Sequence, residues 1–333
     1  MPALARRLAP GQPIVGRPVD VVVVTADTRD LVLRCLERLD DPVIASVTVV
    51  DNGSRDGTIE AVRSAHPDCR VVSCEPPVGY ATACNRGAAG GAGELILFLN
   101  SDILAHDGAV GRLAGALAGD PAAVAAGGRL VDPGTLDTQH RYGPKPFPTL
   151  ATLIARLSGL EQLWPGNPWT TSAVGSAPPD THTTTVDQPA GACLLVERRV
   201  FDAIGGFDDG FWFWYEDVDL ARRLTERGRL LYAPDAVFEH VGGASFARWG
   251  RAEGVRSLVH GIVHYAETAF DHRRRVALAV VVFALSAPRA ILYAPLHRDL
   301  ADAHRAIARA AVDLALGRPV APLMPIPTGP PAR

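Results

Sequence analysis

A run of four valines, Val21 to Val24, constrains the fold of this chain more than any other sequence feature. Such a continuous β-branched segment is typical of a strand buried on both faces, as parallel strands are inside an α/β sheet. Polar residues follow at 25–28, and apolar residues at helical spacing follow at 30–39. The start of the chain therefore predicts a strand, a polar loop and a helix.

The same order recurs further along the chain. Strands are predicted at 46–51, 70–75 and 94–100, and the first and last of them end in the polar groups DNGS and NSD. Repeated strand–helix units indicate a doubly wound, mostly parallel sheet with right-handed crossovers. Ligands bind such sheets beyond the carboxyl ends of the strands, so we expect the polar groups to lie together there.

Breaks in these patterns divide the chain into four regions. Residues 1–18 form an N-terminal extension, 19–247 an α/β domain, 248–317 a set of amphipathic helices, and 318–333 a proline-rich tail that we expect to be disordered. Within the α/β domain, residues 132–186 are rich in proline, glycine and threonine, which predicts a long irregular loop.

The helical region contains one strongly apolar run, at 276–285. Ten residues are too few to cross the hydrocarbon layer of a membrane, and we expect Pro288 to interrupt the helix. Two interpretations stay open: a packed core helix, or an interfacial helix that lies on a membrane with Arg273, Arg274 and Arg275 at its flank.

Composition excludes several classes of protein. The net charge of −3 gives no overall attraction to nucleic acid, so no nucleic-acid partner is expected. The five cysteines include no CxxC pair, which disfavours a disulfide framework and a zinc site and fits a reducing cytoplasm. The N-terminal residues break at proline and glycine before the apolar core of a signal peptide develops.

Three groups of residues are suited to chemistry, and each also has a structural interpretation. Asp51 is either part of a turn or an acceptor for a nucleobase or ribose. Asp102 either caps a helix or binds a divalent cation that bridges two phosphates. The segment FWFWYEDVD at 211–219 is either core aromatics before an acidic helix start, or a sugar pocket beside a general base.

Taken together, VVDNGSRDGT, LFLNSD, the FWFWYEDVDLARRL segment and EHVGGAS resemble, in order and spacing, the motifs of the family 2 inverting glycosyltransferases. The resemblance covers roughly residues 19–270. It implies an α/β fold of the GT-A type, a Rossmann-like, doubly wound, mostly parallel sheet, with a C-terminal helical extension. HRYGPKPFPTL and WPGNPWTT are most similar to actinobacterial rhamnosyltransferases acting on polyprenyl-diphosphate-linked N-acetylglucosamine in cell-wall linker synthesis.

The resemblance implies roles for particular residues. The residues expected to bind the nucleotide-sugar donor are Thr25, Asp51, Asn52, Asn85, Arg86, Asn100, Ser101 and Asp102. Asp102 and His240 are expected to hold a divalent metal ion, Mn²⁺ or Mg²⁺, although NSD keeps only the last acidic residue of a DxD motif.

The acidic pair of the aromatic segment is implied to be catalytic. Asp217 is expected to be the general base, with Glu216 beside it, and Asp219 is expected to take a structural role with Arg222 or Arg223. The aromatic residues expected to wall the acceptor pocket are Trp212, Trp214 and Tyr215.

The implied donor is dTDP-rhamnose, and the implied acceptor is a polyprenyl-diphosphate-linked sugar. The protein is then expected to be cytoplasmic and peripheral on the inner face of the plasma membrane, and it is compatible with a homo-oligomer. Two alternatives stay open: a family 2 transferase that uses UDP-galactose or UDP-N-acetylglucosamine for polysaccharide synthesis, and a non-catalytic nucleotide-sugar-binding module. A dehydrogenase is disfavoured, since no GxGxxG follows the first strand.

Overall fold

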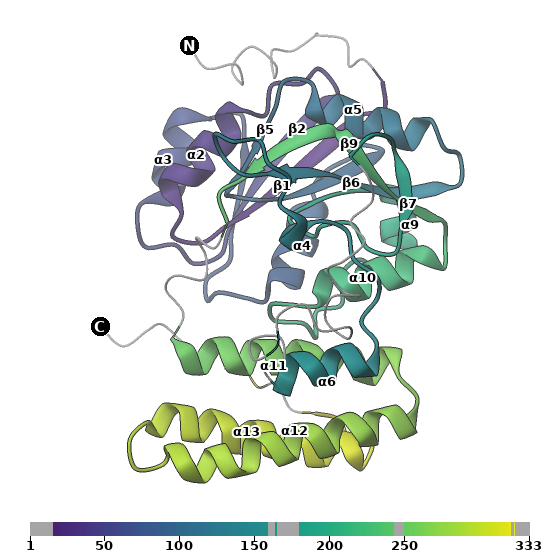
Figure 1. The fold of residues 1–333 in the computed structure, drawn as a ribbon. Helices are drawn as coiled ribbons and strands as arrows, with labels where there is room; N and C mark the ends of the chain where they lie inside the picture. The colour runs from purple at the N-terminus through teal and green to yellow at the C-terminus, as the bar shows by residue number, and fades with distance from the viewer. Residues whose placement is uncertain (1–15, 159–163, 165–179, 243–249, 321–322, 324–333) are drawn as a thin grey trace.

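The computed structural model describes residues 16–158, 164, 180–242, 250–320 and 323. Within these ranges one mixed sheet of nine strands forms the centre of the molecule, and helices cover both of its faces (Figure 1). The predictions for the N-terminal extension before residue 16, for nearly all of WPGNPWTT, for the end of EHVGGAS and for most of the tail lie outside the described residues.

The sheet confirms the predicted α/β fold. Its strands are β1 (Val19–Thr25), β2 (Ile44–Asp51), β3 (Arg70–Ser73), β4 (Leu95–Asn100), β5 (Ile103–Ala105), β6 (Ala123–Val131), β7 (Thr184–Val186), β8 (Cys193–Glu197) and β9 (Arg229–His240). They run in the order β3–β2–β1–β4–β8–β6–β9–β5, with β7 paired to β9. β1 to β4 pair in parallel, as do β6 and β9, whereas β5, β7 and β8 pair antiparallel with their neighbours.

The register of the parallel strands brings polar residues together at the carboxyl ends of the strands. Thr25 is paired with Asp51, and Val24 is paired with Asn100, the last residue of β4. All seven residues of β1 are buried, so the strand that carries Thr25 is held by protein on both faces. The predicted convergence of these strand ends is confirmed.

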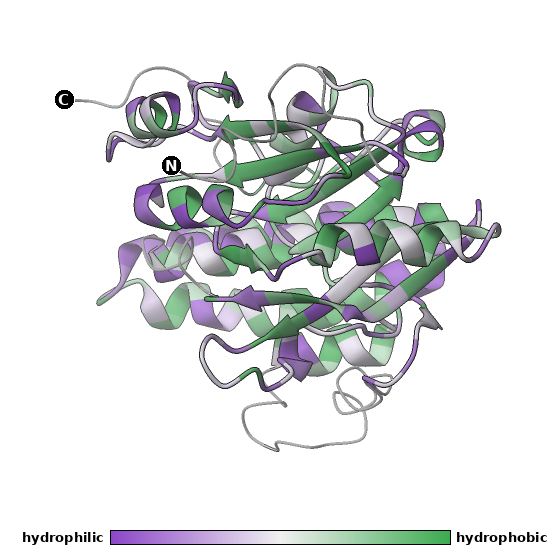
Figure 2. Cartoon of the chain, turned by 90° about the horizontal axis from the view of Figure 1, so that it is seen from above, coloured by the Kyte–Doolittle hydropathy of each residue, from purple (hydrophilic) through white to green (hydrophobic). Residues whose placement is uncertain are grey.

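Alternation along the strands builds a separate core on each face of the sheet. The helices are α2 (Arg29–Glu37), α3 (Thr58–Ala65), α4 (Tyr80–Ala88), α5 (Ala109–Ala118), α6 (Leu150–Ser158), α9 (Arg198–Ala203), α10 (Glu216–Thr225), α11 (Arg251–Ala269), α12 (His272–Tyr293) and α13 (Arg298–Ala315). Val21 and Val23 pack with α2, α3 and α5, whereas Val22 and Val24 pack with α4, α9 and α10. Figure 2 shows the strands as largely hydrophobic between these layers.

The C-terminal helices extend the second core away from the sheet. α12 and α13 pack against each other, α13 contacts α11, and α12 contacts α6. In Figure 1 they form the layer farthest from the sheet. The C-terminal helical extension expected from the sequence is therefore present.

Two sequence predictions about these segments were wrong. Pro288 does not interrupt the apolar helix but lies inside α12, which is 22 residues long and, by length and composition, apolar enough to cross a membrane. Residues 132–186 are not irregular throughout, because the helix α6, the strand β7 and a 3-10 turn at His140–Tyr142 lie within them.

Candidate active site

Hydroxyl groups join the ends of β1 and β4. Thr25 Oγ1 lies 2.8 Å from Thr28 Oγ1, which lies 2.8 Å from Ser101 Oγ, and all three side chains are buried. Each hydroxyl can donate one hydrogen bond and accept others, so two of the three O–H groups are used within the chain and one stays available. Thr25 and Ser101, both predicted at the donor site, are thereby brought together.

The Asp51 carboxylate at the end of β2 is only half satisfied. Its Oδ2 accepts a hydrogen bond from the backbone N–H of Ser54 at 3.1 Å. Its Oδ1 is buried and has no hydrogen-bond partner among the described residues. An unsatisfied buried carboxylate oxygen costs about 1–3 kcal/mol, so a bound ligand that donates an N–H or O–H there would be stabilised.

Three other predicted donor residues lie differently. The Asn52 amide forms hydrogen bonds with both backbone groups of Val78 at 2.8 and 2.9 Å, so it fastens the loop before α4. The Asn85 amide is likewise engaged, with the backbone of Phe207 and with Asp209. Arg86 is exposed. It lies roughly 9 Å along α4 from Tyr80, the first residue of this helix.

Asp102 and His240 face each other at the end of the sheet. Asp102 Oδ2 is 3.7 Å from His240 Nε2, too far for a hydrogen bond, and both side chains are buried. Burial lowers the pKa of His240, against the opposing charge of Asp102, which favours the neutral ring. A buried carboxylate and a neutral imidazole, separated in this way, fit a divalent cation between them.

The tautomer of His240 is set by Gln139, which sequence reasoning missed. Gln139 Nε2 donates to Asp132 Oδ1 and to the His240 carbonyl oxygen, at 2.6 and 2.8 Å, so its Oε1 must be the atom that faces His240 Nδ1 at 2.9 Å. Nδ1 therefore carries the proton, and Nε2 keeps its lone pair toward Asp102. The ring of Tyr142 packs edge-on against the imidazole.

The Asp217 carboxylate, at the start of α10, also lies near the carboxyl ends of the parallel strands. Its Oδ1 accepts a hydrogen bond from the N–H of Val218 at 2.9 Å, and the N–H of Gly191 also donates to it. A side chain at Gly191 would collide with Asp217 Oδ2. The next residue, Ala192, accepts a hydrogen bond from the Asn100 N–H at 3.1 Å, so Asp217 lies near the carboxyl end of β4.

Glu216 and Asp217 differ in protonation. Burial, followed by the charge of Asp217, raises the pKa of Glu216 to about 8, and Glu216 Oε2 has no hydrogen-bond partner among the described residues. Burial also raises the pKa of Asp217, but backbone hydrogen bonds and the charge of Lys145 lower it. Burial and the charge of Asp217 thus favour the protonated form of Glu216, whereas the backbone hydrogen bonds and the charge of Lys145 favour the charged form of Asp217.

Lys145, the only lysine of the chain, is a second residue that sequence reasoning missed. Its backbone N–H donates to Gln188 at 3.1 Å, and its Nζ donates to the Arg141 carbonyl at 2.6 Å. Gln188 lies three residues before Gly191, which contacts Asp217. We call residues 139–145 the strap. Gln139 of the strap contacts His240, and the charge of Lys145 acts on Asp217.

The aromatic segment before α10 has a strained backbone. Trp214 and Tyr215 have φ angles of 76° and 71°, in the left-handed region that costs about 1–3 kcal/mol for such residues. Neighbouring groups hold it: the Tyr80 N–H donates to the Trp212 carbonyl at 2.7 Å, and Ser257 Oγ donates to the Phe213 carbonyl at 3.0 Å. These two left-handed backbone angles set the direction in which α10 begins.

The predicted acceptor residues are not equally exposed. Trp212 and Trp214 are half-buried, whereas Tyr215 is 5% exposed and packs against Tyr265 in the core. Arg156 of α6 lies over the rings of Trp214 and Tyr215, about 6 Å from each centroid. This placement suits Trp212 and Trp214 for a pocket wall and Tyr215 for packing.

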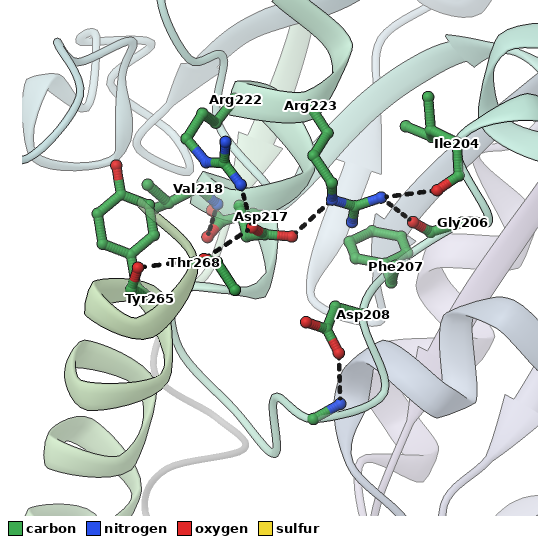
Figure 3. Close-up of polar contacts among 12 residues, drawn as sticks. Ile204, Gly206, Phe207, Asp208, Asp217, Val218, Arg222, Arg223, Tyr265 and Thr268 are labelled. Carbon is green, nitrogen blue, oxygen red and sulfur yellow. Dashed lines mark hydrogen bonds and ion pairs between the residues drawn. The ribbon is translucent and has the colours of Figure 1, made fainter. Parts of the chain in front are cut away.

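Asp219 has the structural role that the sequence predicted. It is buried and accepts hydrogen bonds from Arg223 Nε at 2.7 Å and from Arg222 at 3.2 Å. Figure 3 shows Arg223 reaching onward to the carbonyl oxygens of Ile204 and Gly206. This network ties α10 to the loop that leads into the aromatic segment.

The fold is that of the GT-A glycosyltransferases. The crystal structure of GalNAc-T7 with UDP, GalNAc and Mn²⁺ matches with a TM-score of 0.56 at 15% identity, covering 91% of this chain and 58% of that one, which supports the fold alone. The model of glycosyl transferase family 2 matches residues 20–164, and that of the N-terminal domain of galactosyltransferase matches 181–251. Over residues 20–164 the chain is therefore similar to the family 2 glycosyltransferases.

Curated relatives refine this likeness. The N-acetylglucosaminyl-diphospho-decaprenol L-rhamnosyltransferase of Mycobacterium tuberculosis, in strains CDC 1551 / Oshkosh and ATCC 25618 / H37Rv, is 33% identical over 213 residues, or 59% of this chain. The match spans 66% of that relative, just under two thirds of its length. Rhamnosyltransferase WbbL of Escherichia coli (strain K12) is 44% identical over 52 residues, 15% of this chain and 20% of that one.

Proposed function

We propose that this glycosyltransferase moves L-rhamnose from dTDP-rhamnose to N-acetylglucosamine carried on a polyprenyl diphosphate, with inversion at the transferred carbon. The observation that carries the proposal is the placement of the Asp217 carboxylate near the carboxyl end of β4, which leads into Asp102, itself facing His240 at the end of β9. The name of the mycobacterial relative supports this donor sugar and acceptor. We further propose that the protein works in the cytoplasm, at the inner face of the plasma membrane.

The donor nucleotide is proposed to lie across the ends of β1 and β2. The unpaired Asp51 Oδ1 is suited to accept a hydrogen bond from the imide N–H of thymine, and it would be satisfied only when donor is bound. Thr25, held by the hydroxyl chain, forms the neighbouring part of this surface. Because uracil presents the same imide, this contact alone does not select thymine over uracil.

The chemical step is proposed to be one in-line displacement. The acceptor hydroxyl oxygen forms a bond to the anomeric carbon of the donor sugar as the bond from that carbon to the diphosphate oxygen breaks. Asp217 takes the hydroxyl proton, and the electron pair of the broken bond leaves with the nucleoside diphosphate. Glu216, which is protonated at neutral pH, is suited to donate a hydrogen bond rather than to act as the base.

A divalent cation, Mn²⁺ or Mg²⁺, would be held by Asp102 and His240 and would supply positive charge for the leaving diphosphate. No group of three or more potential metal-ligating side chains is found among the described residues, so the remaining ligands would come from the diphosphate and water. The His240 tautomer, fixed by Gln139, supports this assignment. The Mn²⁺ bound to GalNAc-T7 supports a metal requirement in this fold.

A donor panel tests the proposal. Purified protein is given Mn²⁺, a short-chain polyprenyl-diphosphate-linked N-acetylglucosamine, and dTDP-rhamnose, UDP-galactose or UDP-N-acetylglucosamine. Mass spectrometry is expected to detect a rhamnosyl product with dTDP-rhamnose, and NMR is expected to show inverted anomeric configuration. Transfer from a UDP-sugar but not from dTDP-rhamnose would overturn the donor assignment. Binding of all three donors without any transfer would favour a non-catalytic module.

A UDP-galactose donor is the second candidate. It is supported by the match of residues 181–251 to the model described as the N-terminal domain of galactosyltransferase. That range includes Asp217 and His240, so it concerns the site itself. The panel separates the two candidates directly.

A further inference from the structure

The outer face of α12 is an apolar surface that the proposed active site leaves unused. From Ala277 to Leu296 every exposed residue is apolar. These residues are Ala277, Val280, Phe283, Ala284, Pro288, Ile291, Leu292, Ala294, Pro295 and Leu296. Ala277, Ala284 and Ile291 recur every seven residues, so most of the set forms one continuous stripe along the helix. Ile291 is 78% exposed and Leu296 is 81% exposed.

The opposite face of α12 is already occupied by protein. Leu278, Ala279 and Val282 are buried, and α12 packs against α13 and α6. A helix held in this way cannot cross a bilayer without leaving its partners, even though its length would allow it. The apolar stripe is therefore presented sideways, as in a helix that lies in the plane of a membrane surface.

Charge identifies what covers this stripe. Asp271 caps the start of α12, and the next acidic residue is Asp299. Between them the chain carries five arginines, in a protein whose net charge is −3. Arg273 and Arg274 are exposed at one end of the stripe, and Arg298 is exposed at the other. If a second copy packed on this face, either antiparallel or parallel, basic ends would meet basic ends. An anionic lipid surface satisfies both ends at once.

We propose that the outer face of α12 docks on the anionic surface of a lipid bilayer. The apolar stripe inserts at the boundary between headgroups and acyl chains, and the arginines at its two ends contact lipid phosphates. This inference extends the proposed function, because a polyprenyl-linked acceptor is itself held in a bilayer. It rests on the stripe and its charges, and not on which sugar is transferred.

The position of the docking face relates the bilayer to the active site. α6 packs against α12, and its Arg156 lies over the rings of Trp214 and Tyr215, directly before Glu216 and Asp217. The aromatic segment and the acidic pair therefore lie one helical layer from the face that would touch lipid. An acceptor whose sugar diphosphate emerges from the membrane surface would meet this side of the protein first.

Flotation of the full-length protein with vesicles tests the proposal. Vesicles of phosphatidylcholine alone are compared with vesicles containing 30% phosphatidylglycerol. The unmodified protein is expected to float with the anionic vesicles and to be released by high salt. Phe283→Glu combined with Ile291→Glu is expected to lower the bound fraction at least tenfold, and Arg273→Gln combined with Arg274→Gln is expected to remove most of the preference for anionic lipid.

The control is Leu136→Glu, which places the same charge on an apolar side chain that is 49% exposed in the α/β domain. It is expected to float as the unmodified protein does. Failure of the unmodified protein to bind anionic vesicles, or unchanged flotation of the Phe283/Ile291 variant, would overturn the proposal. So would a dimer in solution that this variant dissociates, or a membrane-bound protein that only detergent extracts.

Transfer to a short-chain, water-soluble acceptor is measured on the same samples, so that the two proposals fail separately. The α12 variants are expected to keep the transfer rate of the unmodified protein. Normal transfer without vesicle binding overturns only the docking face. Vesicle binding without transfer from any donor overturns only the proposed function.

Discussion

At the scale of single residues, the proposed site contains two neighbouring carboxyl groups that differ in their surroundings. Burial and the charge of Asp217 favour the proton on Glu216, because they raise the pKa of Glu216 to about 8. Lys145 and the backbone N–H groups of Gly191 and Val218 favour the charged form of Asp217. The resemblance implies that Asp217 is the base, and the structure adds which neighbouring groups act on each carboxyl.

Removal of the Lys145 charge is expected to make Asp217 harder to ionise. In Lys145→Gln the pKa of Asp217 rises, so the acidic limb of the kcat/KM profile moves to higher pH, and activity at pH 6 falls more than activity at pH 8. Lys145→Arg keeps the charge and is expected to restore the profile. A Lys145→Gln profile that drops equally at every pH would show that Lys145 only holds the strap in place.

Gln139 is expected to control metal affinity without touching the metal. Gln139→Leu removes the acceptor that fixes the His240 tautomer, and Mn²⁺ affinity in the presence of dTDP is expected to fall about 10–100-fold, as measured by electron paramagnetic resonance. The matched control is Gln188→Leu, which removes the hydrogen bond to the carbonyl of Pro146, the residue directly after the strap. Equal losses in both variants would contradict a specific role for Gln139.

At the scale of elements, α11 positions the aromatic segment through a histidine that lies between two carboxylates. His264 Nε2 is 3.0 Å from Asp208, and its Nδ1 is 3.2 Å from Glu267. Burial opposes protonation, but the hydrogen bonds to these carboxylates outweigh it and raise the pKa of His264 to about 9. The charged ring therefore joins α11 to the loop just before the aromatic segment.

This pKa predicts how stability depends on pH. The contribution of His264 to the free energy of unfolding is complete below its unfolded pKa of about 6.5, and it is lost as pH rises through about 9. Urea midpoints of the unmodified protein are expected to fall between pH 7 and pH 9.5, and His264→Gln is expected to weaken that fall. His272→Gln, at an exposed position, is the control. A His264→Gln protein with an unchanged pH dependence would contradict this assignment.

The elements could be predicted where their signals are local. Parallel strands follow from continuous β-branched runs, and the convergence of their ends follows from topology, as the pairing of Thr25 with Asp51 shows. The strap could not be predicted, because it lies in a segment without periodicity and Gln139 meets a residue 101 positions away. Pro288 is tolerated because Ala284, whose carbonyl loses its helical partner, lies on the exposed face of α12.

At the scale of the whole molecule, three layers divide the work. The carboxyl ends of the strands carry the groups suited to the donor, α10 carries the proposed base, and α12 presents an apolar stripe on the far side. The fold class could be predicted from sequence because the motifs that indicate it are local and ordered. The α12 stripe could be recognised only when the buried face of that helix was known.

The most direct test of Asp217 as the general base is the rate of rhamnosyl transfer by Asp217→Asn, compared with that by Glu216→Gln, at pH 7. Asp217→Asn is expected to lower kcat about 10²–10⁴-fold with little change in the dissociation constant for dTDP-rhamnose, because the loss of a general base has effects of this size. Glu216→Gln is expected to retain most activity, since Glu216 is already neutral. An Asp217→Asn protein within tenfold of the unmodified rate would contradict the central claim that Asp217 is the base.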